Sequence, residues 1–342
     1  MTRALISQGP IPGRGPIGYL DMSTQLGDLE LTGPVLTASG CAAAGRELDQ
    51  FFDITQIGGI VTKSVMMQPR SGRPTPRMAE TPSGMLNSIG LQGPGIDRFI
   101  ETDLEWPNNR GATTVVSIAG STVDEYGKLA SRLRPTPGVA AIEVNISCPN
   151  VENRGLVFAC QAESAANVIQ VVRRNSDPRM PIFAKLSPDV TDIVSIVEAV
   201  VRAGATGVSL INTLLGMVIN PDTMRPHLAG QTGGLSGPAI RPVAIRCVWQ
   251  VRQAFPALPI IGMGGIRSGL DALEFILAGA NAVSVGTVVF HDPSSPLRIH
   301  EELQRALIER GFGSLSEAIS FAHRPADAGP PEGEDDFDFI TE

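Results

Sequence analysis

Short apolar runs rich in β-branched residues recur along the chain, and most are followed by an amphipathic stretch with a helical period. The eight strand-like runs are residues 35–40, 59–65, 113–119, 141–147, 182–186, 207–212, 259–262 and 282–286. The clearest helical stretches are 162–175, 192–204, 240–255 and 268–279, with Gly204 and Gly279 placed where glycine commonly ends a helix. Eight strand–helix units predict an α/β fold of the (β/α)8 TIM barrel type, although an open doubly wound sheet would show the same alternation.

Two connections, residues 66–111 and 214–237, are longer than a barrel requires. Both follow the carboxyl end of a predicted strand, which is the end of a barrel that carries the active site. We therefore expect inserted loops that form walls over a ligand at the C-terminal face of the strands. The expected organisation is one barrel domain, residues 21–323, between a flexible segment, 1–20, and an acidic disordered tail, 324–342.

Composition narrows the possible partners and compartments. The formal net charge is -8 and no stretch clusters basic residues with aromatic ones, which argues against nucleic acid as a partner. No signal peptide and no run of about eighteen apolar residues is present, so we expect a soluble protein that is not exported. The four cysteines lie far apart, which argues against a disulfide framework, a metal site or an iron–sulfur cluster and favours the reducing cytoplasm.

The run AAIEVNISCPN, residues 140–150, carries Asn145, Cys148 and Asn150 at the end of a predicted buried strand. Polar side chains in a strand buried on both faces are costly to desolvate, so a ligand explains them better than packing does. Lys63 and Lys185 close two other strands. A lysine can extend to solvent, but at a barrel mouth its ammonium suits an anion or the partially negative ring of a reduced flavin.

The last two strand ends are rich in glycine, at Gly264, Gly265 and Gly286, and the final glycine is followed by Thr287. Loops after the last two strands of a barrel often bind phosphate, because glycines let backbone N–H groups face the anion. Tight turns alone would also explain these glycines. A nicotinamide-binding fold is less well supported, since the third glycine of its motif is missing and Asn281 stands near the position of the ribose-binding carboxylate.

Taken together, these motifs resemble the class 1 dihydroorotate dehydrogenases, and most closely the catalytic subunit of the 1B type, from about residue 26 to residue 323. The segments that carry the resemblance are ASGC at 38–41, PTPR at 74–77, SGMLNSIGL at 83–91, NISCPN at 145–150, KLSP at 185–188, INT at 211–213, GGLSGP at 233–238, GMGG at 262–265 and GT at 286–287.

The resemblance implies an FMN-bearing enzyme that oxidises dihydroorotate to orotate in pyrimidine biosynthesis, with Cys148 as the base. A thiol needs less help than a hydroxyl to ionise, so activity is expected to rise with pH until Cys148 is a thiolate. Carried over by motif, the substrate-binding residues would be Lys63, Asn87, Ser88, Ile89, Gly90, Leu91, Asn145, Asn212 and Thr213. The FMN-binding residues would be Ser39, Lys63, Ser64, Ser117, Asn145, Lys185, Ile211, Gly237, Gly264, Gly265, Gly286 and Thr287.

The chain departs from the family pattern at Ser117, where an asparagine usually faces the flavin. A serine hydroxyl donates one hydrogen bond but reaches less far. The 1B type also implies a partner subunit with FAD and a 2Fe-2S cluster that passes electrons to NAD, in a heterotetramer of two catalytic and two electron-transfer subunits. The homodimeric 1A type, which reduces fumarate, lacks the same parts and stays an alternative.

Three further alternatives remain open from the sequence. The pyrimidine-reducing domain of dihydropyrimidine dehydrogenases resembles the cysteine loop, but it belongs to larger proteins with cysteine clusters. A flavin-free phosphate-binding isomerase or lyase explains the glycine turns and leaves Cys148, Lys63 and Lys185 unexplained. A non-catalytic binding subunit is disfavoured by the intact Cys148, Lys63 and Asn145.

Overall fold

Eight parallel strands close into a barrel in the computed structural model, which describes residues 20–146 and 161–325. The strand order is β3-β16-β15-β10-β9-β8-β7-β4. The two outermost strands of that order are joined by backbone hydrogen bonds from Thr37 N to Gly59 O, 3.2 Å, and from Gly58 N to Val35 O, 2.8 Å. The predicted TIM barrel is confirmed, and an open doubly wound sheet is excluded because the sheet has no free edge.

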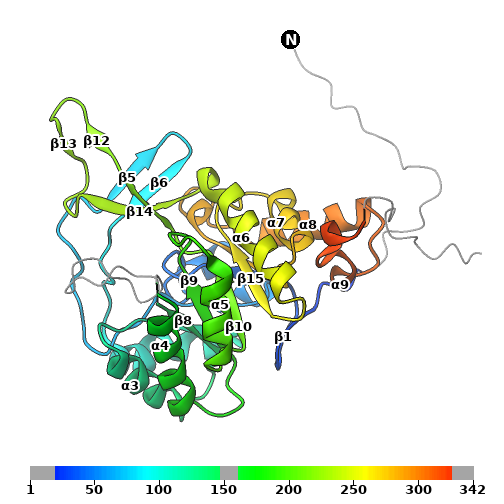
Figure 1. The fold of residues 1–342 in the computed structure, drawn as a ribbon, viewed down its shortest axis with the longest axis horizontal. Helices are drawn as coiled ribbons and strands as arrows, with labels where there is room; N and C mark the ends of the chain where they lie inside the picture. The colour runs from blue at the N-terminus through cyan, green and yellow to red at the C-terminus, as the bar shows by residue number, and fades with distance from the viewer. Residues whose placement is uncertain (1–19, 147–160, 326–342) are drawn as a thin grey trace, which may run out of the picture.

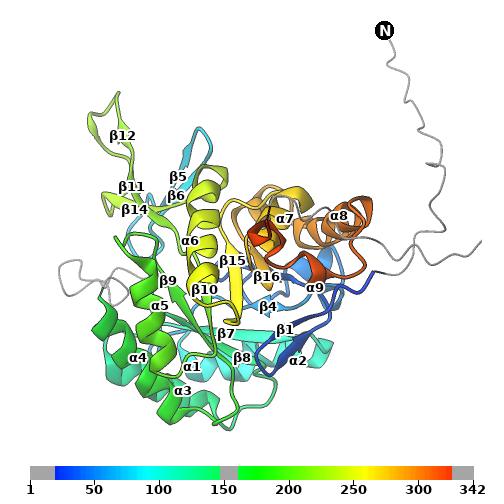
Figure 2. The same ribbon diagram turned by 45° about the vertical axis from the view of Figure 1, so that its right-hand side comes forward.

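Each barrel strand overlaps one of the eight predicted runs. The strands are β3 (Val35–Thr37), β4 (Ile60–Val61), β7 (Thr114–Ile118), β8 (Ala141–Asn145), β9 (Ile182–Leu186), β10 (Gly207–Leu210), β15 (Ile260–Met263) and β16 (Ala282–Val285). The main outer helices are α3 (Val123–Leu133), α4 (Ala162–Asn175), α5 (Ile193–Arg202), α6 (Arg241–Ala254), α7 (Gly269–Leu277) and α8 (Ser295–Glu309). These helices lie outside the strands (Figures 1 and 2).

The described chain also contains shorter helical segments. They are η1 (Leu48–Gln50), η2 (Ile54–Gln56), α1 (Ile96–Arg98), η3 (Phe99–Asp103), α2 (Glu105–Arg110), η5 (Pro238–Ile240), η6 (Thr287–Phe290), α9 (Leu315–Ala318) and η7 (Phe321–His323). No helix within residues 20–146 and 161–325 is long and apolar enough to cross a membrane.

Two outer helices, α5 and α7, begin and end at residues that favour helix ends. The side chain of Asp192 accepts hydrogen bonds from the first turn of α5, and Ser268 and Asp271 form a capping box at the start of α7. Gly204 and Gly279 follow these two helices with φ angles of 106° and 116°, a region that favours glycine, as expected from the sequence.

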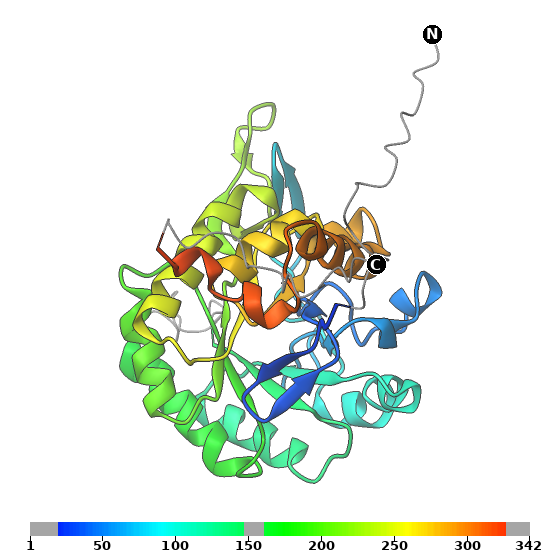
Figure 3. The same ribbon diagram turned by 90° about the vertical axis from the view of Figure 1, so that its right-hand side faces the viewer.

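An antiparallel hairpin, β1 (Thr24–Leu26) and β2 (Leu29–Leu31), lies across the amino-terminal end of the barrel (Figure 3). Its Leu26 and Leu31 belong to the same buried cluster as Val115, Phe183 and Ile261 from the barrel strands. This apolar plug closes one end of the barrel, so polar chemistry is confined to the opposite, carboxyl end of the strands.

The two long connections form a second sheet rather than irregular loops. Its strands are β5 (Met78–Thr81), β6 (Gly84–Asn87), β11 (Leu214–Met217) and β14 (Thr232–Ser236), in the antiparallel order β11-β14-β6-β5. A smaller hairpin, β12 (Ile219–Asn220) with β13 (Arg225–Pro226), extends from it, and together they project from the barrel (Figures 1 and 2). Sequence reasoning did not predict this sheet, because β6 and β14 pair across about 150 residues, which no local pattern reveals.

Candidate active site

A continuous chain of polar side chains crosses the carboxyl ends of the strands. The Nδ2 atom of Asn145 donates to Ser64 Oγ at 3.0 Å, and Ser64 Oγ lies 2.9 Å from Ser117 Oγ. Asn212 Nδ2 donates to Asn145 Oδ1 at 3.2 Å, and Ser39 Oγ lies 3.3 Å from Ser64 Oγ. Five residues proposed from separate motifs are thus in direct contact, because parallel strands deliver their carboxyl ends to one face.

Glu143 joins this chain, and sequence reasoning missed it. It lies in the middle of β8 with a side chain that is 1% exposed. Its Oε1 atom accepts a hydrogen bond from Ser117 Oγ at 3.1 Å and is 3.4 Å from Nζ of Lys185. The sequence contained a signal for it, because an acidic residue within an apolar strand is even more costly to bury than the asparagines that drew attention there.

Ser117 is fully buried, and its hydroxyl contacts both Ser64 and Glu143. Its short side chain therefore takes part in the polar chain within the barrel. The departure from asparagine at this position leaves the network continuous.

The segment predicted to surround the substrate is held by its neighbours. Ser88 Oγ accepts a hydrogen bond from Arg73 Nη1 at 2.8 Å, and the Ile89 carbonyl accepts one from Arg73 N at 2.9 Å. Gly90 has a φ of 80°, and a Cβ atom there would lie 2.8 Å from Arg73 N. Arg73 thus fixes the backbone of residues 88–90. The hydrogen bond from Arg73 occupies one of the acceptor positions of the Ser88 hydroxyl.

Asn87 and Thr213 come from different connections and meet at Gly234 of β14. The Nδ2 atom of Asn87 donates to Gly234 O at 3.4 Å, and a Cβ atom on Gly234 would overlap the Thr213 hydroxyl. Thr213 N also donates to Asn212 Oδ1 at 2.9 Å. The small sheet therefore connects the predicted substrate segment to the end of β10.

The glycines predicted for phosphate binding converge on one point. Gly264 and Gly265 follow β15 with φ angles of 129° and 80°, and a Cβ atom on Gly265 would lie 2.8 Å from the carbonyl oxygen of Gly237. Thr287, beside Gly286, donates to Ser236 Oγ at 2.8 Å. Backbone packed this closely without side chains fits a phosphate cradle, as the terminal group of FMN would need.

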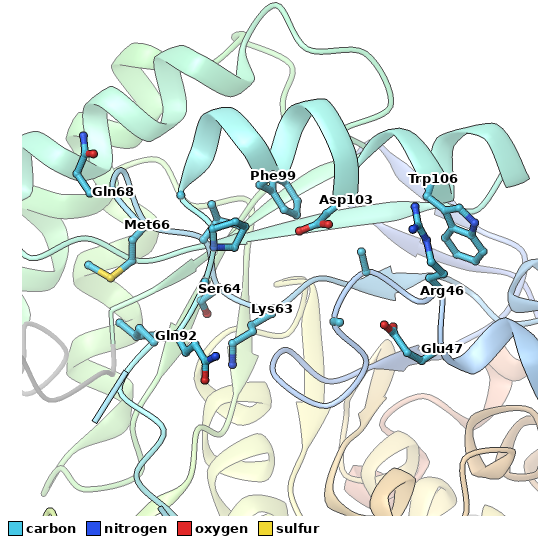
Figure 4. Close-up of a pocket in the computed structure, with 17 residues that line it drawn as sticks. Arg46, Glu47, Lys63, Ser64, Met66, Gln68, Gln92, Phe99, Asp103 and Trp106 are labelled. Atoms are coloured by element: carbon cyan, nitrogen blue, oxygen red, sulfur yellow. The ribbon is translucent and has the colours of Figure 1, made fainter. Parts of the chain in front are cut away.

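A cavity adjoins the strand ends on the side of β4. Among its lining residues are Lys63, Ser64 and Leu91, together with Gln92 and Trp106. Lys63 and Gln92 lie near one another on its wall (Figure 4). Three residues proposed for substrate or flavin thus share this cavity, whereas the glycine cradle is not part of its lining.

Cys41, the last residue of the ASGC motif, lies near both lysines of the site. Burial raises the pKa of its thiol to about 11, while the positive charges of Lys185 and Lys63 act in the opposite direction. A thiol with this pKa stays protonated at neutral pH, so Cys41 is a poor base.

Asn281 serves the barrel rather than a nucleotide ribose. It lies just before β16, at the amino-terminal end of the strand, and its Oδ1 accepts from Arg252 Nη2 at 2.8 Å and from Ile260 N at 3.0 Å. These contacts lie at the end of the barrel opposite the polar chain.

Cys148, the proposed base, falls outside the described residues. β8 ends at Asn145, and the described residues on this side of Cys148 end at Ile146, two residues before it. Residues 20–146 and 161–325 contain no group of three or more His, Cys, Asp or Glu side chains that could hold a metal ion.

Comparison with known proteins gives one consistent family. The family model described as dihydroorotate dehydrogenase matches residues 21–307. The chain is 48% identical over 304 residues to a protein of Desulforamulus reducens, which covers 89% of this chain and 99% of that one. It is 50% identical over 299 residues to a protein of Geotalea daltonii, covering 87% and 97%, and 47% identical over 298 residues to one of Geobacillus kaustophilus, covering 87% and 94%. All three relatives are named dihydroorotate dehydrogenase B (NAD(+)), catalytic subunit.

Proposed function

The chain belongs to the dihydroorotate dehydrogenase family, and from this premise we propose that it oxidises dihydroorotate to orotate in pyrimidine biosynthesis with FMN as its flavin. The observation that carries the proposal is the polar chain at the barrel mouth, in which Lys185, Asn145 and Asn212 meet beside a glycine cradle. Amide groups suit a pyrimidine, because its ring presents alternating N–H donors and C=O acceptors.

Each part of the mouth has a task in this reaction. Asn87, Asn145, Asn212 and Thr213, with residues 88–91, hold the pyrimidine, and Lys63 faces both substrate and flavin. Ser39, Ser64, Ser117, Lys185, Ile211 and Gly237 would hold the flavin ring and its chain, and Gly264, Gly265, Gly286 and Thr287 would bind its phosphate. When bound, the flavin accepts the hydride that leaves C6 of the substrate.

Cys148 takes the proton from C5 of the substrate in this proposal. The reference pKa of a cysteine thiol, about 8.5, makes the thiolate accessible near neutral pH. Lys63 and Lys185 supply positive charge that favours transfer of negative charge toward the flavin.

We further propose that electrons leave through a partner subunit with FAD and a 2Fe-2S cluster, which reduces NAD. The relatives' names support this, since each describes the catalytic subunit of an NAD(+)-linked enzyme. They favour the 1B type over the fumarate-linked 1A type. For this chain we propose a heterotetramer with two subunits of each kind. The free thiols of Cys41 and Cys247 suit the reducing cytoplasm. The functional domain is residues 21–323, with 1–20 and 324–342 as its tails.

The direct test is to mix the purified yellow protein with dihydroorotate under anaerobic conditions and follow the visible absorbance of oxidised flavin. Bleaching on mixing is expected, and orotate should appear in equal amount. A yellow protein that stays yellow with dihydroorotate would reject the substrate, and a colourless protein that cannot be reconstituted with FMN would reject the cofactor.

The role of Cys148 is tested by Cys148→Ser in the same experiment. Serine fills the space but ionises poorly, so flavin reduction should slow while FMN stays bound. Cys247→Ala, which removes a buried thiol of α6, controls for the loss of a thiol elsewhere and should keep the wild-type reduction rate. When the partner subunit and NAD are added, only those proteins whose flavin is reduced by dihydroorotate should catalyse continuous turnover.

A further inference from the structure

Glu143 is a buried acid for which stability offers no sufficient reason. Its side chain is 1% exposed and that of Lys185 is 6% exposed, and their closest atoms are 3.4 Å apart. Removing two charges from water costs several kcal/mol, so a buried ion pair is often no more stabilising than apolar residues of the same volume. The pair also lies next to the proposed flavin and substrate groups, which points to a role in the site.

The carboxylate imposes a direction on the hydroxyl groups beside it. A carboxylate offers only acceptors, so Ser117 must donate its single proton to Glu143 Oε1, 3.1 Å away. Ser117 then has no proton for Ser64, and the 2.9 Å contact between these hydroxyls requires Ser64 to donate to Ser117.

The same reasoning extends to the amides. Because the Ser64 proton is used, Ser64 can only accept from its other partners, which are Ser39 Oγ at 3.3 Å and Asn145 Nδ2 at 3.0 Å. The NH2 group of Asn145 must therefore face Ser64, which turns its Oδ1 toward Asn212 Nδ2 at 3.2 Å. Asn212 Oδ1 in turn accepts from Thr213 N at 2.9 Å. The Glu143 carboxylate at one end of the chain and the Thr213 N–H at the other therefore require the same orientation of both amides.

We propose that Glu143 is a positioning residue that serves both halves of the site. It holds the Lys185 ammonium at the flavin, and through Ser117 and Ser64 it fixes, together with the Thr213 N–H, which edges of Asn145 and Asn212 present donors and acceptors to the pyrimidine. The inference rests on the proposed function, because the flavin and the pyrimidine are the groups that these residues would meet.

The test uses the FMN-loaded protein with two variants. Glu143→Gln keeps the shape but removes the charge and can donate as well as accept. Its bound flavin should have a more positive reduction potential, since Lys185 loses its counter-charge, and its orotate dissociation constant should rise about tenfold, as when a buried hydrogen bond is left unmade. Ser117→Ala interrupts the chain but leaves the Glu143–Lys185 pair, so orotate binding should weaken by a similar factor with a much smaller change in potential.

Ser209→Ala is the matched control. Ser209 is the register partner of Lys185 on β10, is fully buried, and its hydroxyl has no hydrogen-bond partner among the described residues. Removing it disturbs the same region of the barrel without touching the chain, so potential and orotate affinity should both stay at their wild-type values.

Unchanged potential and unchanged orotate affinity in Glu143→Gln, with only a lower melting temperature, would overturn the inference and leave Glu143 a structural residue. If Glu143→Gln does not fold, Ser117→Ala decides: wild-type orotate affinity there would overturn the relay. If the wild-type protein binds FMN and is reduced by dihydroorotate but the variants behave like wild type, this inference fails while the proposed function stands. If the wild-type protein is not reduced by dihydroorotate, the proposed function itself fails.

Discussion

The hydroxyl group of Tyr126 donates a 2.8 Å hydrogen bond to the backbone carbonyl of Asn145. Tyr126 lies on α3 and is only 2% exposed, and Asn145 is the last residue of β8. An outer helix thus holds the end of the strand that carries an amide of the candidate site and, three residues later in sequence, Cys148.

Tyr126→Phe should weaken this end of β8. Phenylalanine fills the same space but leaves a buried carbonyl without this donor, so the free energy of unfolding should fall by about 1–2 kcal/mol. Reduction of the flavin by dihydroorotate should also slow, because the amide of Asn145 loses its fixed position. Ser176→Ala is a suitable control, since it removes a buried hydroxyl bonded to Val172 O on α4 and should reduce stability without slowing reduction. Equal reduction rates in the two variants would contradict the positional role of Tyr126.

Gly265→Ala should impair FMN binding. The φ of 80° is unfavourable for alanine by roughly 1–2 kcal/mol, and its Cβ atom would lie 2.8 Å from the Gly237 carbonyl oxygen. We expect the FMN dissociation constant to rise at least about tenfold, because the two turns must separate. Gly111→Ala is the control. Gly111 has a similar φ, 76°, but no atom lies within 4 Å of its Cβ position, so this substitution introduces the backbone strain without a steric contact. Fluorescence titration of the apoproteins with FMN should separate the two, and equal affinities would argue against the cradle.

Lowering the pH should destabilise the protein through His300 on α8. Burial lowers the pKa of this imidazole from its usual 6.5, and its Nδ1 atom has no hydrogen-bond partner among the described residues. Below pH 6.5 the unfolded chain takes up a proton that the folded protein resists, so stability falls as the pH drops toward the folded-state pKa. Above 6.5 both states are neutral and the effect vanishes. The melting temperatures of wild type and His300→Gln should converge as the pH is lowered through this range. If the two melting temperatures change in parallel with pH, His300 is not the cause of the pH dependence.

Native Cys41 should resist alkylation. Its pKa of about 11 leaves almost no thiolate at neutral pH, and the thiolate is the form that reacts with iodoacetamide. Peptide mass spectrometry at about pH 8 should show slow labelling of Cys41 in the native protein and fast labelling after denaturation. The raised pKa also predicts a loss of stability as the pH rises above 9 toward 11, since the thiol of the unfolded chain ionises first. Rapid native labelling would show that Lys63 and Lys185 outweigh burial.

The barrel could be predicted because its signals are local. Every strand of the barrel is a short buried run, and each of α4, α5, α6 and α7 overlaps a predicted helix, since period and capping are written within a few neighbouring residues. The sequence also predicted that Lys63, Asn145, Lys185 and Asn212 lie close together, because a barrel brings the carboxyl ends of all its strands to one face.

The sequence by itself therefore determined the fold class, and it predicted that Lys63, Asn145, Lys185 and Asn212 come together at the carboxyl ends of the strands. Only the tertiary structure decided that residues 66–111 and 214–237 share one sheet, and that Glu143 connects Lys185 to Ser117 and the amides. The reason is physical: period and capping depend on neighbours in sequence, whereas strand pairing and the direction of a hydrogen-bonded chain depend on groups that meet only after the barrel has closed.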